Sequence, residues 1–88
     1  MKQNPNFLLR EVADSLVLVP VGEATKAFPG MITMNPTAKF LWELLAQEQT
    51  AESLTAALVE RYEVSRETAA EDVAAFLQKL TSATAVIV

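Results

Sequence analysis

The order of apolar and polar positions divides the chain into two parts of different texture. Residues 7–34 contain short apolar runs rich in β-branched side chains, which are typical of strands. Residues 36–81 repeat apolar side chains at i, i+3, i+4 and i+7, the spacing of helices that bury one face. Strands that come first, with helices after them, predict an α+β fold rather than a parallel α/β sheet.

The first two strands are expected at residues 7–12 and 16–21, joined by a turn over 13–15. The second strand is apolar along most of its length, which indicates that both of its faces are covered. Pro20 has no N–H to donate to a ladder, so it belongs at a sheet edge or at a strand end. These features predict a short antiparallel hairpin, which Gly22 ends.

A third, short strand is expected at residues 31–34. A polar loop over residues 23–28 and the turn signal Pro29-Gly30 come before it. Because this strand is brief, apolar and preceded by a loop, we expect it at the edge of the sheet. Side chains alternate along a strand, so half of them should face the core.

Three helices are expected, each with a residue that caps its N-terminus. Asn35 followed by Pro36 predicts a first helix that ends near residue 47, since Asn accepts free helix N–H groups and Pro fits the first helical position. Thr50 and Ser65 are the caps expected for the second and third helices. The expected core residues are Ala38, Leu41, Trp42, Leu44 and Leu45 in the first helix, Leu54, Ala57, Leu58 and Tyr62 in the second, and Ala69, Val73, Phe76, Leu77 and Leu80 in the third.

Length and composition predict one domain over residues 1–88, with a modest core. The chain has 51% hydrophobic and 20% charged residues, an ordinary globular balance. Its apolar tail, residues 85–88, should add a short strand or pack on the core. The stretch 1–6 is polar and unlike a signal peptide, and no run has the roughly 20 apolar residues of a membrane span. We therefore expect a cytoplasmic protein without a membrane partner.

The sequence contains no cysteine and no histidine. Disulfides, zinc ribbons and thiol nucleophiles are thereby excluded, and the commonest general base is missing. No nucleophile–base pair, phosphate loop or metal cluster can be recognised, so we expect no enzymatic activity and no cofactor. The formal net charge of −4 disfavours nucleic acid, because phosphate contacts need a basic face, and favours a basic or mixed-charge peptide as partner.

An ordered set of motifs resembles the PqqD family. The motifs are the hairpin segments 9–12 and 19–23, residues 30–38, the aromatic-rich helix 40–45, the following helix pair, and residues 72–77. The resemblance extends over residues 7–83, nearly the whole chain. The family often has a Gly after its third helix, whereas this chain has Thr81-Ser82-Ala83-Thr84, so the conformation of that end is left open.

The resemblance implies a small winged helix-turn-helix, in which a three-stranded antiparallel sheet is followed by three helices. It also implies a function, since PqqD-like proteins recognise ribosomally made precursor peptides. The leader segment of such a peptide adds as an extra strand to the third strand and lies in a groove between that strand and the third helix. The partner is a modifying enzyme, often a radical S-adenosylmethionine enzyme that carries the iron–sulfur chemistry itself. Coenzyme PQQ synthesis is the founding example, and many relatives serve other peptides.

The peptide site that this resemblance implies comprises the third strand and one face of the third helix. Asp72, Ala75 and Lys79 are spaced at i, i+3 and i+7 and share a face, where the two charged side chains can meet charges on a peptide. Methionine packs adaptably, which suits a groove that receives a peptide. The predicted peptide-binding residues are Met31, Ile32, Thr33, Met34, Asp72, Ala75, Phe76 and Lys79.

Two other functions fit the same elements. A protein–protein interaction subunit that binds no leader peptide is not separated from the first hypothesis by the sequence. A winged-helix DNA-binding regulator is the second, although Glu67, Glu71 and Asp72 near the start of the third helix would repel phosphates. Asp14-Ser15-Leu16 resembles the phosphopantetheine site of carrier proteins, but here the serine opens a β-branched run. A free strand edge and an apolar tail also allow a homodimer.

Overall fold

The structure, a computed structural model, describes residues 1–27 and 30–87, within which there are five strands and four helices. In chain order these are β1 (Lys2–Gln3), β2 (Phe7–Val12), β3 (Ser15–Pro20), α1 (Ala24–Ala27), β4 (Ile32–Met34), α2 (Pro36–Leu44), α3 (Ala51–Tyr62), α4 (Arg66–Ser82) and β5 (Val86–Ile87). Strands β2, β3 and β4 form an antiparallel sheet in that order, and β1 pairs with β5 in a separate sheet. The predicted α+β class and the three-stranded antiparallel sheet are confirmed.

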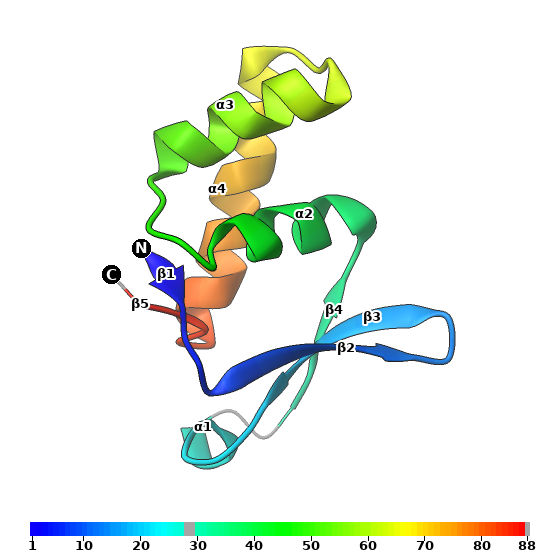
Figure 1. Ribbon diagram of the computed structural model, residues 1–88, viewed down its shortest axis with the longest axis vertical. Coiled ribbons are helices and arrows are strands. Elements are labelled where there is room, and N and C mark those ends of the chain that lie inside the picture. Colours follow the sequence, from blue (N-terminus) through cyan, green and yellow to red (C-terminus); the bar gives the residue numbers. More distant parts are fainter. Residues whose placement is uncertain (28–29, 88) are drawn as a thin grey trace.

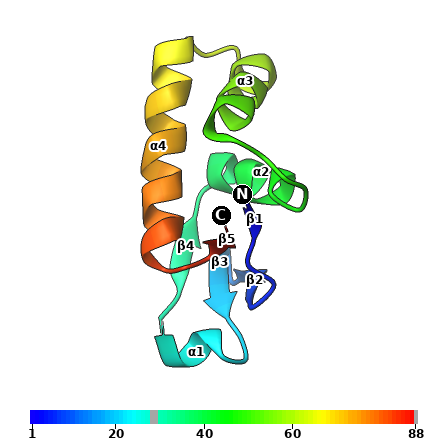
Figure 2. The ribbon, with the colours of Figure 1, turned by 90° about the vertical axis from the view of Figure 1, so that its left-hand side faces the viewer.

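The helices α2, α3 and α4 lie at one end of the molecule, and the β2–β3 hairpin projects away from them (Figure 1). In the turned view, α4 runs along one side, with its C-terminal half beside β4 (Figure 2). The strands β3 and β2 follow on the other side of β4. The arrangement therefore sets the edge of the sheet that β4 forms next to the last turns of the longest helix.

The register of the hairpin fixes which way its backbone groups point. A two-residue turn separates the paired residues Val12 and Ser15, so this pair exchanges two hydrogen bonds. Bonded and non-bonded pairs alternate along an antiparallel ladder, which makes Phe7 and Pro20 a non-bonded pair. The missing N–H of Pro20 therefore costs no bond to β2, and Pro20 ends β3 as predicted.

The same alternation assigns the backbone groups of β4. Ile32 and Met34 pair with the residues of β3 that turn their N–H and C=O toward β4. Thr33, between them, points its own N–H and C=O toward the open edge of the sheet. The hydrogen bonds between β3 and β4 end at Ile32. The next residue of β3 that faces β4 is Pro20, which has no N–H to donate. This explains why β4 begins one residue later than the predicted strand at 31–34.

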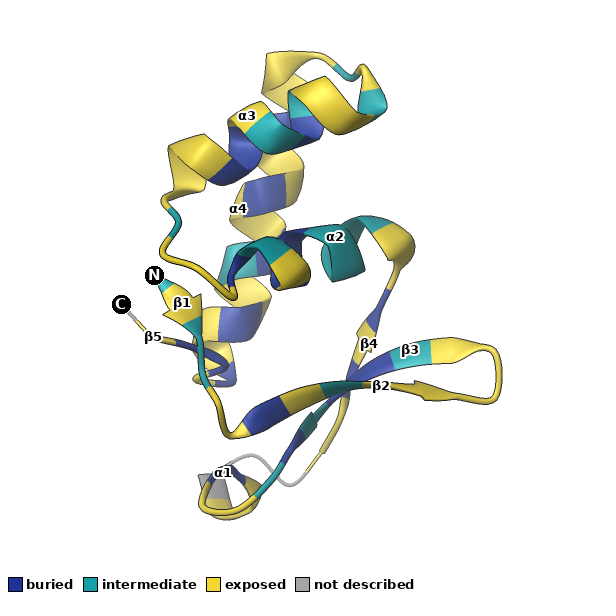
Figure 3. Cartoon of the chain, in the orientation of Figure 1, coloured by how far each residue is buried: buried dark blue, intermediate teal, exposed yellow. Residues whose placement is uncertain are grey.

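One face of the sheet packs on the helices, and the other exposes most of its residues on the outer strands β2 and β4 (Figure 3). Val17 of the central strand β3 is buried on that second face, as Leu18 is on the first, so the prediction that both faces of this strand are covered holds at its middle. The inner face contributes Phe7, Leu18, Ile32 and Met34 to the core that it shares with the helices. Every helix residue predicted for the core is buried or half-buried, Trp42 among them. Of residues 31–34, the second and fourth are buried and the other two are exposed, which confirms the expected alternation.

The three predicted helix caps are confirmed. Asn35 accepts a hydrogen bond from the Ala38 N–H at 2.8 Å and so fixes the start of α2 directly after β4. Thr50 and Ser53 form a reciprocal capping box at the start of α3. Ser65 caps α4 without such a reciprocal bond, and its side-chain oxygen accepts from the Thr68 N–H at 3.1 Å. Each cap typically stabilises the fold by about 1 kcal/mol.

The first predicted helix is shorter than expected, since α2 ends at Leu44 and not near residue 47. The N–H groups of residues 45–47 bond to carbonyls three residues earlier, at 3.1–3.2 Å, which is the tighter pattern of a closing turn. The side-chain Nε2 of Gln49 donates to the Leu44 carbonyl at 3.0 Å. No Gly or Pro marks this end in the sequence, so the pattern did not reveal it.

Three short elements complete the fold. Helix α1 lies within the segment predicted as a polar loop at 23–28, and β1 lies in the stretch 1–6, for which no element was predicted. The strand expected in the C-terminal tail is confirmed as β5, which pairs with β1. The predictions for Phe28, Pro29 and Val88 fall outside the described residues.

The end of α4 settles the conformation that the sequence left open. Thr84, with a φ of 58°, takes the left-handed conformation in which glycine is usual. The Thr84 N–H bonds to the Thr81 carbonyl at 3.0 Å, and the Ala85 N–H bonds to the Leu80 carbonyl at 2.8 Å. This pair of bonds forms a Schellman motif. Thr84 therefore occupies the helix-ending position that glycine usually takes, at the cost of backbone strain.

Candidate functional site

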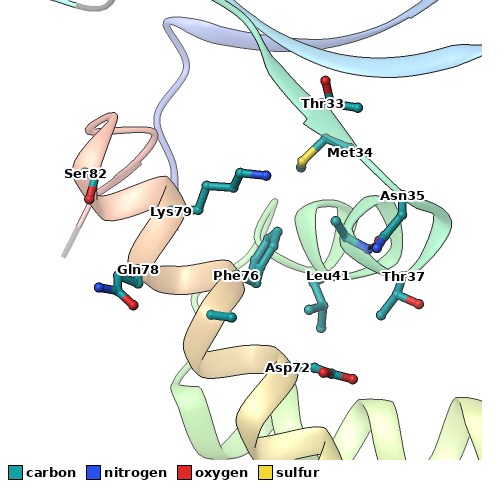
Figure 4. Close-up of a pocket in the computed structure, with 12 residues that line it drawn as sticks. Thr33, Met34, Asn35, Thr37, Leu41, Asp72, Phe76, Gln78, Lys79 and Ser82 are labelled. Atoms are coloured by element: carbon teal, nitrogen blue, oxygen red, sulfur yellow. Dashed lines mark hydrogen bonds between the residues drawn. The ribbon is translucent and has the colours of Figure 1, made fainter.

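A groove of about 550 Å³ lies between β4 and α4 (Figure 4). The end of β4, the first turns of α2 and one face of α4 form it. Its lining residues are Thr33, Met34, Asn35, Thr37, Ala38, Leu41, Asp72, Ala75, Phe76, Gln78, Lys79 and Ser82. Segments far apart in the sequence are thus brought together at one place, beside the open edge of the sheet.

The floor of the groove is apolar and held by the core. Met34, Leu41 and Phe76 expose only 5%, 1% and 8% of their surface, and each belongs to the hydrophobic core. Met34 faces inward from β4, Leu41 comes from the second turn of α2, and Phe76 comes from the middle of α4. Because core side chains are closely packed, these three present a pre-formed surface to any ligand.

The strand side of the groove offers backbone groups. Among the described residues β4 pairs with β3 alone, so the N–H and C=O of Thr33 border the groove without a strand partner. Residues 31–35 carry no charge, and a charged side chain is one of the usual devices that block a sheet edge. This edge is therefore a template on which an extended peptide can pair.

The helix side of the groove carries one charge of each sign. Asp72 and Lys79 are seven residues apart on α4, which corresponds to about 10.5 Å along the helix axis. The Lys79 side chain extends toward Met34, whereas Asp72 lies at the other end, near Leu41 (Figure 4). Neither charge takes part in an ion pair within the described part of the chain. Both are therefore available to charges on a ligand.

A second hollow of about 520 Å³ continues the groove past Lys79. Its lining comes from the start of β4 and the end of α4, and it includes Met31, Ile32, Thr33, Ser82 and Ala83. Met31 is 62% exposed, the most exposed of the large hydrophobic side chains described. The two hollows together follow the whole length of β4.

The structure brings all of the sequence-predicted site residues to this place. Thr33, Met34, Asp72, Ala75, Phe76 and Lys79 line the main groove, and Met31 and Ile32 line the hollow beside it. The shared helix face predicted from the spacing of Asp72, Ala75 and Lys79 is confirmed. The contacts of these residues with a peptide stay a prediction.

Several lining residues were not predicted from the sequence. Gln78 and Ser82 follow Ala75 and Lys79 by three positions, so the same helical spacing could have identified them. The residues that α2 contributes, from Asn35 to Leu41, carry no such signal. The junction from β4 through Asn35 into α2 was predicted, but only the fold reveals that the first turns of α2 lie beside α4 at the groove.

Other chemistry has less support from the described residues. In residues 1–27 and 30–87, no group of three or more Asp or Glu side chains is placed to hold a metal ion. No helix in those ranges is long and apolar enough to cross a membrane. Ser15 begins a strand and not a helix, so the resemblance of Asp14-Ser15-Leu16 to a carrier-protein site does not extend to its structure.

Comparisons with known proteins agree with this geometry. TbiB1 in complex with the TbiA(β) leader peptide has a TM-score of 0.74 and 21% identity, over 97% of this chain and 93% of that one. A lasso peptide synthetase B1 complexed with the leader peptide has a TM-score of 0.68 and 22% identity, over 91% of this chain and 88% of that one. At such identities the likeness shows a shared fold. A comparison with curated proteins gives no match.

The family is shown by a different comparison. The model of the family described as coenzyme PQQ synthesis protein D (PqqD) matches residues 15–86. This range extends from the start of β3 to β5 and contains every residue that lines the groove. The chain therefore belongs to the PqqD family.

Proposed function

We propose that this protein captures the leader segment of a ribosomally made precursor peptide and presents it to a modifying enzyme. The leader adds as a strand to residues 31–34 and lies in the groove between β4 and α4. The observation that carries the proposal is the uncharged open edge at Thr33, which borders a groove with an apolar floor. Membership of the PqqD family supports the same role, as do two neighbours of the same fold, both solved with leader peptides.

The physical basis of binding is strand addition. Each backbone hydrogen bond contributes about 0.5–1.5 kcal/mol net, and an ordinary disordered peptide loses about 2–5 kcal/mol on ordering. Backbone bonds alone therefore barely offset the ordering cost, and side chains buried on Met34, Leu41 and Phe76 must supply the remainder. We expect dissociation constants in the micromolar range, about −8 kcal/mol.

The protein has a binding role and no catalytic role in this proposal. With no histidine or cysteine in the chain, the reaction chemistry belongs to the partner enzyme. Family resemblance suggests a radical S-adenosylmethionine enzyme, which brings its own iron–sulfur cluster. This protein itself then needs no cofactor and acts in the cytoplasm, where precursor peptides are made.

The two alternative functions have less support. As a DNA-recognition helix, α4 would present Glu67, Glu71 and Asp72 to the phosphates, and all three side chains are exposed. Its first-turn Arg66 lies 3.9 Å from Glu52 and is partly engaged. A protein–protein interaction subunit without leader binding leaves the open edge of β4 and its groove without a role.

Direct titration tests the proposal. Fluorescently labelled leader segments, taken from the precursor peptides encoded beside this gene, are titrated with the purified protein and followed by anisotropy. A saturable signal in the micromolar range is expected with one of them. If a folded protein leaves every segment unbound at millimolar concentration, leader recognition is wrong, and a protein partner becomes the better hypothesis.

A further inference from the structure

We infer that the groove selects a particular pattern of side chains: two apolar residues separated by one position, followed on the C-terminal side by an acidic residue that Lys79 contacts. This inference rests on the proposed function and adds to it the chemistry of the peptide. It is carried by the register of β4, the floor of the groove and the position of the one lysine that lines it.

The register of β4 fixes which peptide side chains point inward. Within β4, Thr33 is the one residue whose N–H and C=O both point toward the open edge. The peptide residue that pairs with it in an antiparallel strand donates one hydrogen bond to Thr33 and accepts another from it. Directly opposed residues share a face, so the side chain of that partner points to solvent, as Thr33 does. The peptide residues on either side lie opposite Ile32 and Met34 and share their inward face.

The floor decides what these two inward side chains should be. The side chain opposite Met34 meets the almost fully buried Met34, Leu41 and Phe76. The side chain opposite Ile32 enters the second hollow, where it meets the buried Ile32 and Ala83 beside Lys79 and Ser82. A polar side chain placed there would lose water without gaining a partner. The two inward positions therefore favour apolar residues, and the outward position between them is free to vary.

The charges at the ends of the groove give the pattern a direction. Lys79 lines both the groove and the hollow at the Ile32 end, whereas Asp72 lines only the groove, at its Met34 end. A peptide antiparallel to β4 has its C-terminal part at the Ile32 end and reaches Lys79 there. The acidic residue therefore belongs after the apolar pair, and the Asp72 end disfavours an acid before it.

Selection from a displayed library of random linear peptides tests this pattern. The library is selected in parallel against the natural protein and two variants that close the site, Thr33→Pro at the edge and Ala75→Leu in the groove. Peptides enriched only by the natural protein should carry the apolar pair with an acid after it. A chosen peptide is then made with the acid and with the matching amide, and both are titrated against Lys79→Gln and Arg10→Gln.

The contact with Lys79 has a defined size and control. Removing either the peptide acid or the Lys79 charge should weaken binding about two- to fivefold, the range for an exposed ion pair. Removing both charges should weaken binding no more than removing one. Arg10→Gln removes the same charge from β2, on the opposite edge of the sheet, and should leave the affinity unchanged.

The possible outcomes separate the inference from the function beneath it. Enriched peptides that lack the alternation, or an acid whose effect is the same in Lys79→Gln and in the natural protein, would overturn the inference and leave leader binding standing. An equal loss in Arg10→Gln would also overturn it, because the effect would then be general charge attraction. A selection in which no peptide prefers the natural protein over both closed variants would overturn the proposed function itself.

Discussion

The two outer strands of the sheet, β2 and β4, both lack a further strand partner in the described structure. They differ in length, in charge and in what lies beside them. β2 is six residues long, and β4 only three. β2 carries the exposed charges of Arg10 and Glu11, whereas residues 31–35, around β4, are uncharged. The hairpin that contains β2 projects away from the helices, and β4 lies beside α4 (Figures 1 and 2).

The comparison indicates that a sheet edge becomes a binding site when another element packs beside it and forms a groove, and that the length of the edge strand matters less. The longer edge offers more backbone groups, yet backbone bonds contribute little net free energy and no selectivity. The shorter edge has α4 as a second wall and Met34, Leu41 and Phe76 as a floor. The charged side chains on β2 disfavour pairing of that edge with another strand, whereas the edge of β4 carries no such charge.

The largest expected effect comes from a proline placed in each edge. Thr33 and Glu11 both turn their N–H outward, so proline at either position removes no bond within the sheet. Thr33→Pro should raise the dissociation constant of a leader peptide about ten- to a hundredfold, since it removes an edge donor and obstructs the approaching strand. Glu11→Pro should leave it unchanged. Anisotropy titration measures both, and thermal unfolding checks that both variants fold.

Either of two results would break the comparison. If Glu11→Pro weakened binding as much as Thr33→Pro, the two edges would not differ in function. If a folded Thr33→Pro variant bound with natural affinity, strand addition at β4 would be wrong.

A smaller effect is expected from filling the groove. Ala75 and Ala74 are neighbouring exposed alanines on α4, and only Ala75 lines the groove. Ala75→Leu should raise the dissociation constant about tenfold, because it occupies space that the peptide side chains need. Ala74→Leu is the matched control, with the same change in helix propensity and no expected loss. Equal affinities for the two variants would show that the peptide does not enter the groove.

The cap that joins β4 to α2 should have a moderate effect on stability. Asn35→Ala removes the bond to the Ala38 N–H and should lower the free energy of unfolding by about 1 kcal/mol, measured in urea. Thr50→Ala removes the corresponding cap of α3 at a similar cost. Only Asn35→Ala should also weaken peptide binding, since Asn35 lines the groove. Equal affinities in the two variants would mean that the cap does not position the binding edge.

The smallest effect is expected at the tip of the hairpin. Ala13 has a φ of 55° at the first position of a two-residue turn, where glycine is preferred. Ala13→Gly should relieve this strain and raise the free energy of unfolding by less than about 1 kcal/mol, after the entropy that glycine adds to the unfolded chain. Peptide affinity should not change. A change in affinity would indicate that the β2 side of the sheet takes part in binding.

Much of the fold follows from local sequence signals. The caps Asn35, Thr50 and Ser65 each have a side chain that satisfies a helix terminus, and the helical repeat identified the core residues after them. The elements that were missed depend on distant partners. β1 exists because β5 pairs with it across the whole length of the chain, and no local pattern marks a two-residue strand.

The site shows the same division between local and distant information. The face of α4 with Asp72, Ala75 and Lys79 was predictable from spacing. The strand at 31–34 was predicted from its apolar run and the turn signal before it, and its role in peptide binding came from the family resemblance. The contribution of α2 was not predictable, since Leu41 reaches the groove only through the path of the chain after Asn35. Sequence spacing identifies the residues of one helix face, but packing decides which other elements meet that face.

The measurement that tests the central claim most directly is a backbone-amide NMR titration of the labelled protein with a leader peptide. Thr33 and residues 72–82 should shift with the peptide, while the amides of Leu9 and Glu11, which face the edge of β2, should keep their positions. Shifts concentrated on β2, with β4 unaffected, would contradict the account, because the peptide would then use the charged edge and not the uncharged one.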